Sequence, residues 1–278
     1  MSAGLVVTNL KPHIGAAVEL DRSAFRDDGV IAKLRDLLEQ CGVLVFPRIG
    51  LSDEEQLALT DRLGTRADFA RLQGATDSGV YRVSLDPRHN PQAEYVQATF
   101  FWHMDGLTAG IIPPKATLLS ARSVAAKGGQ TEFANTYAAY ESLSESEKAE
   151  IAHLRVFHGL QASMKLVMES PMEEHFALWK RTAQAYPLVW RHRSGRKSLV
   201  LGSTADYVLD MPKPNGRALL SRLLEWTVQP DFLYRHNWEV GDLVIWDNCG
   251  TLHRVIPYAE DSGRLMHRTS IEGVEPLE

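Results

Sequence analysis

The alternation of apolar and polar positions predicts two helices near the start of the chain. Residues 28–41 place Ile31, Leu34 and Leu38 at helical spacing, and the glycine that follows is a common residue at a helix C-terminus. In LSDEEQLAL, Ser52 and Glu55 form a capping-box pattern, which predicts a second helix that ends near the next glycine. The apolar run VLVFP between them reads as a strand. We therefore expect both helices to cover a sheet.

The rest of the chain is rich in short β-type runs separated by turns. VYRVSL and YVQATFFW flank the turn-rich DPRHNPQ, which predicts a hairpin-like pair of strands. Further strands are predicted over ATLLSARSV, after the glycine pair of KGGQTEF, and over DLVIWDN and LMHRTSIEG. A second capping box, Ser144 with Glu147, predicts a helix to about Leu154, and NGRALLSRLLEWTVQ predicts an amphipathic helix. Residues 162–183 read as irregular or helical.

This order of elements favours one domain over residues 1–278, with a partly helical insertion around 135–190. A chain of 278 residues with 44% hydrophobic content is long enough to bury one sizeable core. Helices gather toward the ends and in the insertion and do not alternate regularly with strands. The pattern therefore predicts a mainly β (α+β) fold, a β-sandwich or jelly roll with helical cover. Neither a G-x-G-x-x-G nor a G-x-x-x-x-G-K-[ST] motif is present, which removes the usual support for dinucleotide or nucleoside triphosphate binding.

Charge and cysteine content narrow the expected partners. The chain has 30 Lys and Arg against 35 Asp and Glu, a net charge of −5, and no basic stripe. We expect a small-molecule substrate, and neither nucleic acid nor a membrane as partner. Cys41 and Cys249 are too few and too distant for a disulfide framework and suit a reducing compartment. Because the N-terminus lacks a signal-peptide pattern and no run of about 18 apolar residues occurs, we expect a cytoplasmic protein.

The segment FFWHMDGL carries the first candidate chemistry. On an extended strand His103 and Asp105 point to the same face and Met104 to the other, so an imidazole and a carboxylate can reach one ion. With 10 histidines and 35 acidic residues in 278 positions, about one such H-x-[DE] pair is expected by chance. The plain alternative is a histidine hydrogen-bonded to a nearby acid at the end of a strand.

A site of two histidines and one carboxylate, which leaves positions on the metal open, needs a second histidine. His253 follows the strand and turn of DLVIWDNCG, which predicts a position at the end of a sheet facing the interior. His267 and His192 are its rivals. A ligand imidazole must be neutral, so metal binding is expected to weaken as the pH falls through the histidine range.

Several motifs follow one another in order along the chain. They are WH-x-D, GG-x-T ending at Thr131, YPLVWRHRSGRKSL, WDN-x4-H and the arginine of GRLMHR, with 25 residues between Asp105 and Thr131 and ten between His253 and Arg264. In order and spacing they resemble the taurine dioxygenase/2,4-D dioxygenase family of iron(II)- and 2-oxoglutarate-dependent oxygenases. The resemblance extends from the VLVFP strand to the C-terminus.

The resemblance implies a double-stranded β-helix, a cupin-like jelly-roll variant, and a role for each residue of the motifs. His103, Asp105 and His253 would bind iron(II). Arg264 would bind the far carboxylate of 2-oxoglutarate together with Thr131. A guanidinium suits that task because its planar fork matches the two carboxylate oxygens.

The resemblance also implies the reaction. O2 and 2-oxoglutarate would be consumed, succinate and CO2 released, and the substrate hydroxylated, since Asp105 is the carboxylate that related halogenases lack. Arg268 would contact 2-oxoglutarate or an anionic organic substrate, the alternative being a structural ion pair. The candidate pocket residues, by position alone, are Tyr81, Gln97, Phe101, Met104 and Arg268.

Two other classes of protein stay open at this point. One is a non-redox metal hydrolase, because histidine and carboxylate ligands also suit zinc. The other is a non-catalytic jelly-roll binding protein. The turn residues Asp247 and Asn248 are expected to aim His253 at the metal. Relatives are often dimers or tetramers, so a homo-oligomer is also open.

Overall fold

The structure of the protein is a computed structural model that describes residues 4–67 and 79–278. Residues 1–3, the first of the N-terminal segment considered above, lie outside that description. The largest sheet is antiparallel except for the pair β2 and β3. Its strands are, in spatial order, β1 (Val6–Asn9), β2 (Ala16–Glu19), β3 (Val43–Phe46), β13 (Leu243–Asp247), β5 (Ala116–Ser123), β15 (Leu265–Ile271) and β4 (Tyr81–Val83).

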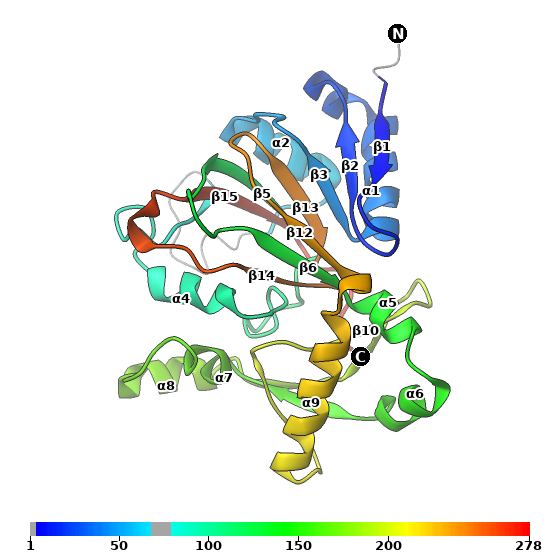
Figure 1. Cartoon of the computed structure of the whole chain (residues 1–278), viewed down its shortest axis with the longest axis vertical. Coiled ribbons are helices and arrows are strands. Elements are labelled where there is room, and N and C mark those ends of the chain that lie inside the picture. The colour runs from blue at the N-terminus through cyan, green and yellow to red at the C-terminus, as the bar shows by residue number, and fades with distance from the viewer. Residues whose placement is uncertain (1–3, 68–78) are drawn as a thin grey trace.

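A smaller antiparallel sheet packs against the large one (Figure 1). Its strands are, in spatial order, β12 (Leu233–His236), β6 (Thr131–Asn135) and β14 (Thr251–Val255). Between the two sheets, Phe133 of β6 packs with Leu119, Val244 and Met266 of the large sheet in one buried cluster. The predicted sandwich of two sheets is confirmed.

The two N-terminal helices cover the outer face of the large sheet, as predicted. Helix α1 (Asp28–Cys41) ends at Gly42, whose φ of 71° is the left-handed conformation that glycine adopts most easily. Helix α2 (Asp53–Leu63) begins with the predicted capping box of Ser52 and Glu55. Buried leucines of both helices share a cluster with Phe46 of β3 and Ile245 of β13, so burial of this apolar face fixes the helices on the sheet.

One predicted strand is wrong. Residues of YVQATFFW form helix α4 (Ala93–Gln97) and the 3-10 turn η2 (Ala98–Phe100) in place of a strand. Val96 and Phe100, four residues apart, share one helical face and pack against Val255 and Tyr258. The β-branched and aromatic residues of this run suggested a strand, but packing against a neighbouring element overrides that propensity.

Residues 135–190, where the sequence predicts a partly helical insertion, carry most of the remaining helices. It contains α5 (Thr136–Glu141), α6 (Glu145–Ile151), α7 (Leu160–Met164) and α8 (Glu173–Lys180), and α6 has the predicted capping box but ends before Leu154. A third sheet follows the order β11 (Ala205–Val208), β7 (Arg155–His158) and β8 (Gln184–Pro187). The short pair β9 (Val189–Arg191) and β10 (Lys197–Leu199) lies beside α5.

The long predicted amphipathic helix, α9 (Lys213–Thr227), packs against β11 and α5 (Figure 1). Its buried leucines join a cluster under the small sheet that includes Leu252 of β14 and Ala134 of β6. Short 3-10 turns complete the order at Arg22–Arg26, Pro230–Phe232 and Glu260–Ser262. Within residues 4–67 and 79–278, no helix has the length and apolar character needed to span a membrane.

Candidate metal centre

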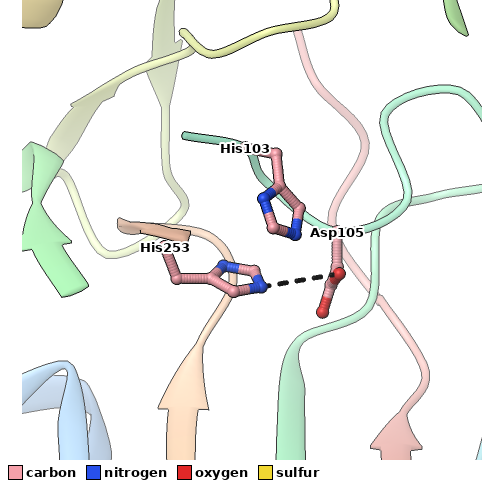
Figure 2. A group of neighbouring side chains, drawn as sticks. All are labelled: His103, Asp105 and His253. Carbon is pink, nitrogen blue, oxygen red and sulfur yellow. Dashed lines mark ion pairs between the residues drawn. The ribbon is translucent and has the colours of Figure 1, made fainter. Parts of the chain in front are cut away.

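Three side chains from two distant segments of the sequence converge beside β14, the edge strand of the small sheet. Figure 2 shows His103, Asp105 and His253 facing a common centre, and one ligand atom of each lies within 4.8 Å of the others. His253 belongs to β14, and His103 joins it through a two-residue antiparallel bridge with N···O distances of 3.0 Å in both directions. This bridge holds the two imidazoles side by side, with ring centroids 4.1 Å apart. The predicted convergence of these three residues is present.

The extended backbone at His103 ends two residues later. Asp105 begins a turn, and Met104 points into the hydrophobic cluster below the small sheet. His103 and Asp105 therefore face the same way, as alternation along a strand predicts, although the strand is only a bridge long.

The imidazole of His103 has a defined tautomer. Its Nδ1 lies 2.8 Å from the carbonyl oxygen of Phe101. A carbonyl oxygen only accepts, so Nδ1 carries the proton and Nε2 keeps a lone pair. Burial lowers the pKa of His103, although the nearby Asp105 carboxylate opposes the shift. The neutral imidazole that metal binding requires is thus the favoured form.

Burial also lowers the pKa of His253 well below its ordinary value, and the neighbouring His103 adds to the effect. The His253 side chain is buried, with the indole ring of Trp246 at a centroid distance of 4.7 Å. Both imidazoles of the site are consequently held neutral by the same physical cause.

Asp105 uses its two carboxylate oxygens differently. Oδ2 accepts a hydrogen bond from Thr117 Oγ1 at 2.8 Å and lies 3.1 Å from Nη2 of Arg268. Oδ1 lies 3.7 Å from Nε2 of His253, which is too long for a hydrogen bond. Burial acts to raise the pKa of Asp105, but the positive charge of Arg268, the neighbouring imidazoles and the hydrogen bond from Thr117 together outweigh it and leave the pKa at about 2. The carboxylate is therefore charged, with Oδ1 turned toward His253.

The three convergent residues line a pocket that also contains Thr131, Arg264 and Arg268. The other lining residues are Val83, Thr99, Leu119, Trp246, Arg254 and Val255. Arg264 lies just before β15 and Arg268 lies within it, so one short segment brings two guanidinium groups to the pocket. A cavity that combines convergent polar groups with apolar walls is typical of a small-molecule site.

Arg264 is the most deeply buried charge of the pocket, with a relative exposure of 3%. Its guanidinium carbon lies 4.8 Å from the ring centroid of Tyr258, and a Cβ added at Gly129 would come within 3.1 Å of its Cδ and Nε. Burial lowers the pKa of Arg264, with Tyr258 opposing. Within the described part of the chain no carboxylate forms an ion pair with this guanidinium, and such a buried charge requires a counter-ion. The pocket is therefore suited to an anionic ligand.

Of the residues expected in the pocket from position alone, Arg268 lines it, whereas the four others are not among its lining residues. Tyr81 accepts a hydrogen bond from Asn90 at 2.8 Å, and Gln97 donates one to Glu260 at 3.0 Å. Phe101 contributes its backbone carbonyl to His103, and Met104 is part of a core cluster.

Arg254 is a pocket residue that the sequence did not single out. It follows His253 in β14, and its guanidinium carbon lies 4.8 Å from the ring centroid of Trp102. Its Nε donates to the buried carboxylate of Glu132 at 2.7 Å. In the sequence, the indication of this role is that Arg254 directly follows the candidate ligand His253.

The rival histidines lie elsewhere. His267 points to the outer face of the large sheet, where its Nδ1 is 2.7 Å from Asp53 of α2. His192 contacts Ser198 at 2.8 Å and Glu275 at 3.4 Å. Among the residues that the structure describes, His103, Asp105 and His253 are the one group of this kind with metal-binding geometry.

The fold and the site together define a class, that of jelly-roll proteins with a centre of two histidines and one carboxylate. The family model described as "Taurine catabolism dioxygenase TauD, TfdA family" matches residues 7–270. The chain belongs to this family, whose members are 2-oxoglutarate-dependent dioxygenases and hence oxidoreductases. The resemblance inferred from the ordered motifs is confirmed.

Relatives of known activity cover nearly the whole chain. The (S)-phenoxypropionate/alpha-ketoglutarate-dioxygenase of Sphingobium herbicidovorans is 30% identical over 280 residues, which is 98% of this chain and 96% of the relative. The alpha-ketoglutarate-dependent 2,4-dichlorophenoxyacetate dioxygenase of Cupriavidus pinatubonensis is 33% identical over 285 residues, covering 96% and 97%.

Solved structures agree in fold. The crystal structure of AAD-2 in complex with Mn(II) and N-oxalylglycine has a TM-score of 0.83 and 32% identity, and the match covers 99% of this chain and 100% of that one. A taurine dioxygenase from Burkholderia xenovorans, described as putative and alpha-ketoglutarate-dependent, has a TM-score of 0.80 and 26% identity, with 98% and 94% covered. These proteins have the jelly-roll fold, so the predicted fold class is confirmed.

Proposed function

We propose that the protein is an iron(II)- and 2-oxoglutarate-dependent dioxygenase that hydroxylates a small anionic organic substrate. Succinate and CO2 are the products of the co-substrate. The observation that carries the proposal is the convergence of His103, Asp105 and His253 in one pocket with the buried guanidinium of Arg264. The first group suits a divalent metal and the second suits a carboxylate.

In this proposal His103, Asp105 and His253 hold iron(II). Two neutral imidazoles and one charged carboxylate form the donor set that non-haem iron oxygenases use, and it leaves coordination positions for ligands from solution. When bound, iron(II) supplies the activation of O2, coupled to the oxidative decarboxylation of 2-oxoglutarate. The apolar walls around the centre limit the entry of water, which protects a reactive oxidant from side reactions.

Arg264 and Thr131 bind the far carboxylate of 2-oxoglutarate. The hydroxyl of Thr131 accepts a hydrogen bond from Trp238 Nε1 at 2.9 Å. An indole N–H only donates, so the hydroxyl hydrogen of Thr131 is left to donate to a ligand. A donor hydroxyl beside a buried guanidinium matches a carboxylate in both charge and hydrogen bonding.

The proposed substrate is anionic because Arg254 and Arg268 line the same pocket as Arg264. The relatives support this class, since phenoxypropionate and 2,4-dichlorophenoxyacetate are carboxylates and a further relative from Pseudomonas putida is named a sulfate ester dioxygenase. Leu119, Val83 and Val255 add apolar surface for the organic part of such a molecule.

Anaerobic addition of iron(II) and 2-oxoglutarate tests the metal and the co-substrate together. We expect the wild-type protein to develop the visible charge-transfer band of the ternary complex and His253→Ala to develop none. His267→Ala is the matched control, because that histidine lies on the opposite face of the sheet, and it is expected to keep the band.

Turnover then separates the classes of protein. A screen of aryloxy carboxylates, alkyl sulfates and sulfonates, scored by succinate, is expected to give release that depends on O2. Loss of substrate without O2 and without succinate would indicate a metal hydrolase. Binding of iron and 2-oxoglutarate with neither substrate loss nor succinate would indicate a binding protein.

A further inference from the structure

A chain of hydrogen bonds with a defined direction ends on Asp105. Trp246 Nε1 donates to Asn248 Oδ1 at 2.8 Å, and Asn248 Nδ2 donates to Thr117 Oγ1 at 2.9 Å. Thr117 Oγ1 then donates to Asp105 Oδ2 at 2.8 Å. All four side chains are buried.

The chemistry of the groups allows this chain to run in one direction only. The indole N–H of Trp246 is a donor and the carboxylate of Asp105 is an acceptor. The amide of Asn248 therefore accepts through its oxygen and donates through its nitrogen. Because Thr117 already accepts from that amide, its own hydrogen is left for Asp105.

The strand register of the large sheet fixes the positions of these hydrogen-bonded side chains. Thr117 of β5 pairs directly with Trp246 of β13, and Asn248 follows in the turn after β13. The turn was expected to aim His253, but the amide of Asn248 acts on the Asp105 side of the site. Both strands lie in the centre of the sheet, so the backbone that carries the Thr117 side chain is hydrogen-bonded to a strand on each side.

The consequence is a difference between the two oxygens of one carboxylate. Oδ2 is engaged by Thr117 and by Arg268, whereas Oδ1 faces His253. We propose that Thr117 is a positioning residue whose hydroxyl holds Oδ2, so that Asp105 presents Oδ1 alone to the metal. This inference rests on the proposed function, because it requires a metal between the three ligands. Partners that orient a ligand in this way commonly contribute about 10–100-fold to metal affinity.

A structural role for Thr117 makes a different prediction. A buried hydroxyl that only completes the hydrogen bonding of the core would change the free energy of unfolding and leave metal affinity alone. Metal affinity, measured apart from turnover, is therefore the property that separates the two roles.

The test is the titration of metal-free protein with Mn(II) alone, with free Mn(II) followed by its electron paramagnetic resonance signal. We expect Thr117→Val, which keeps the shape and removes the hydroxyl, to raise the Kd by about 10–100-fold. Thr117→Ser restores the hydroxyl and is expected to stay within about threefold of wild type. Thr136→Val is the control, because Thr136 is equally buried and its Oγ1 has no hydrogen-bond partner in the described chain.

The outcomes of this titration distinguish failure of the Thr117 role from failure of the proposed function. A Kd for Thr117→Val equal to that of Thr136→Val and wild type overturns the positioning role while the proposed function stands. A rise for Thr117→Val that Thr117→Ser does not reverse also overturns it, because the hydroxyl is then not the cause. If thermal melting shows that Thr117→Val is unfolded, Thr117→Ala takes its place. Wild-type protein that binds no Mn(II), with or without 2-oxoglutarate, counts against the proposed function itself.

Discussion

Two histidine–carboxylate pairs lie on opposite sides of the large sheet and differ in the distance between the imidazole nitrogen and the carboxylate oxygen. On the outer face, Nδ1 of His267 lies 2.7 Å from Oδ1 of Asp53. Between the sheets, Nε2 of His253 lies 3.7 Å from Oδ1 of Asp105, and the two groups are not hydrogen-bonded to each other. The outer pair is also the more solvated, since the Asp53 side chain is 34% exposed and that of Asp105 is 8% exposed.

The difference shows what distinguishes a metal centre from an ordinary polar contact. In the outer pair the two groups are hydrogen-bonded to each other, and Arg122 adds an ion pair to Asp53 at 2.7 Å. In the inner group, burial would make unsatisfied polar atoms costly, yet the carboxylate and two imidazoles face one point without bonding. A cation at that point would bind one ligand atom of each of the three groups at once. A histidine close to an acid is therefore weak evidence for a metal centre. Buried ligand atoms that converge without bonding to one another are stronger evidence.

The largest expected effect comes from removing the charge of each carboxylate in turn. Asp105→Asn is expected to weaken Mn(II) binding by more than the roughly 10–100-fold typical of a residue that only orients a ligand, because a neutral amide is a poor metal ligand. Asp53→Asn is expected to leave the Kd for Mn(II) unchanged. Isothermal titration of both metal-free variants measures this contrast, and equal losses would remove the distinction between the two pairs.

The guanidinium groups of the two regions extend the comparison. Arg122 on the outer face has a carboxylate partner within the protein, whereas the buried Arg264 has an aromatic ring. Arg264→Lys is expected to raise the apparent KM for 2-oxoglutarate about 10–100-fold, since a charged hydrogen bond contributes about 1.5–3 kcal/mol and lysine cannot form the planar fork. Arg122→Lys is the matched control. Steady-state succinate assays at saturating substrate check the ranking, and an unchanged KM in Arg264→Lys contradicts the assigned role.

Elements controlled by nearby residues could be predicted from the sequence. The capping boxes at Ser52 and Ser144 and the left-handed Gly42 fix helix ends through contacts within a few residues, so they are readable locally. The run from Tyr95 to Trp102 could not be read in this way. Its residues up to Phe100 are helical, and they pack against Val255, which is distant in the sequence.

The same limit applies to the site. The spacing of His103 and Asp105 is local, but the choice of His253 over two other histidines depended on the order of motifs along the whole chain. Of the positional pocket candidates, Gln97, Phe101 and Met104 lie close to His103 in the sequence but do not line the pocket, because sequence distance does not determine which way a side chain points. The role inferred for Thr117 has no local signature, because its partners Asn248 and Asp105 come from separate segments joined only by sheet register.

The smallest expected effect concerns the outer pair and its dependence on pH. Burial lowers the pKa of His267 below the ordinary value of 6.5, although Asp53 opposes the shift. The unfolded chain then binds a proton at His267 more readily than the folded chain, so stability is fully present above about pH 6.5 and decreases as the pH falls below it. The pKa of Asp53 is itself lowered from 3.8, because His267 and Arg122 outweigh the effect of burial, so its contribution is lost only at more acidic pH.

Substitutions of the two partners should therefore change the pH dependence in opposite directions. His267→Gln removes the titrating group, and its free energy of unfolding should decrease less between pH 7 and pH 5 than that of wild type. Asp53→Asn removes the group that opposes the shift, so the pKa of His267 falls further and the decrease should be steeper. Urea denaturation at the two pH values measures both slopes. Identical slopes in the two variants would mean that the hydrogen bond between these residues does not couple to folding. The contrast between a hydrogen-bonded outer pair and the metal centre would then have no energetic basis.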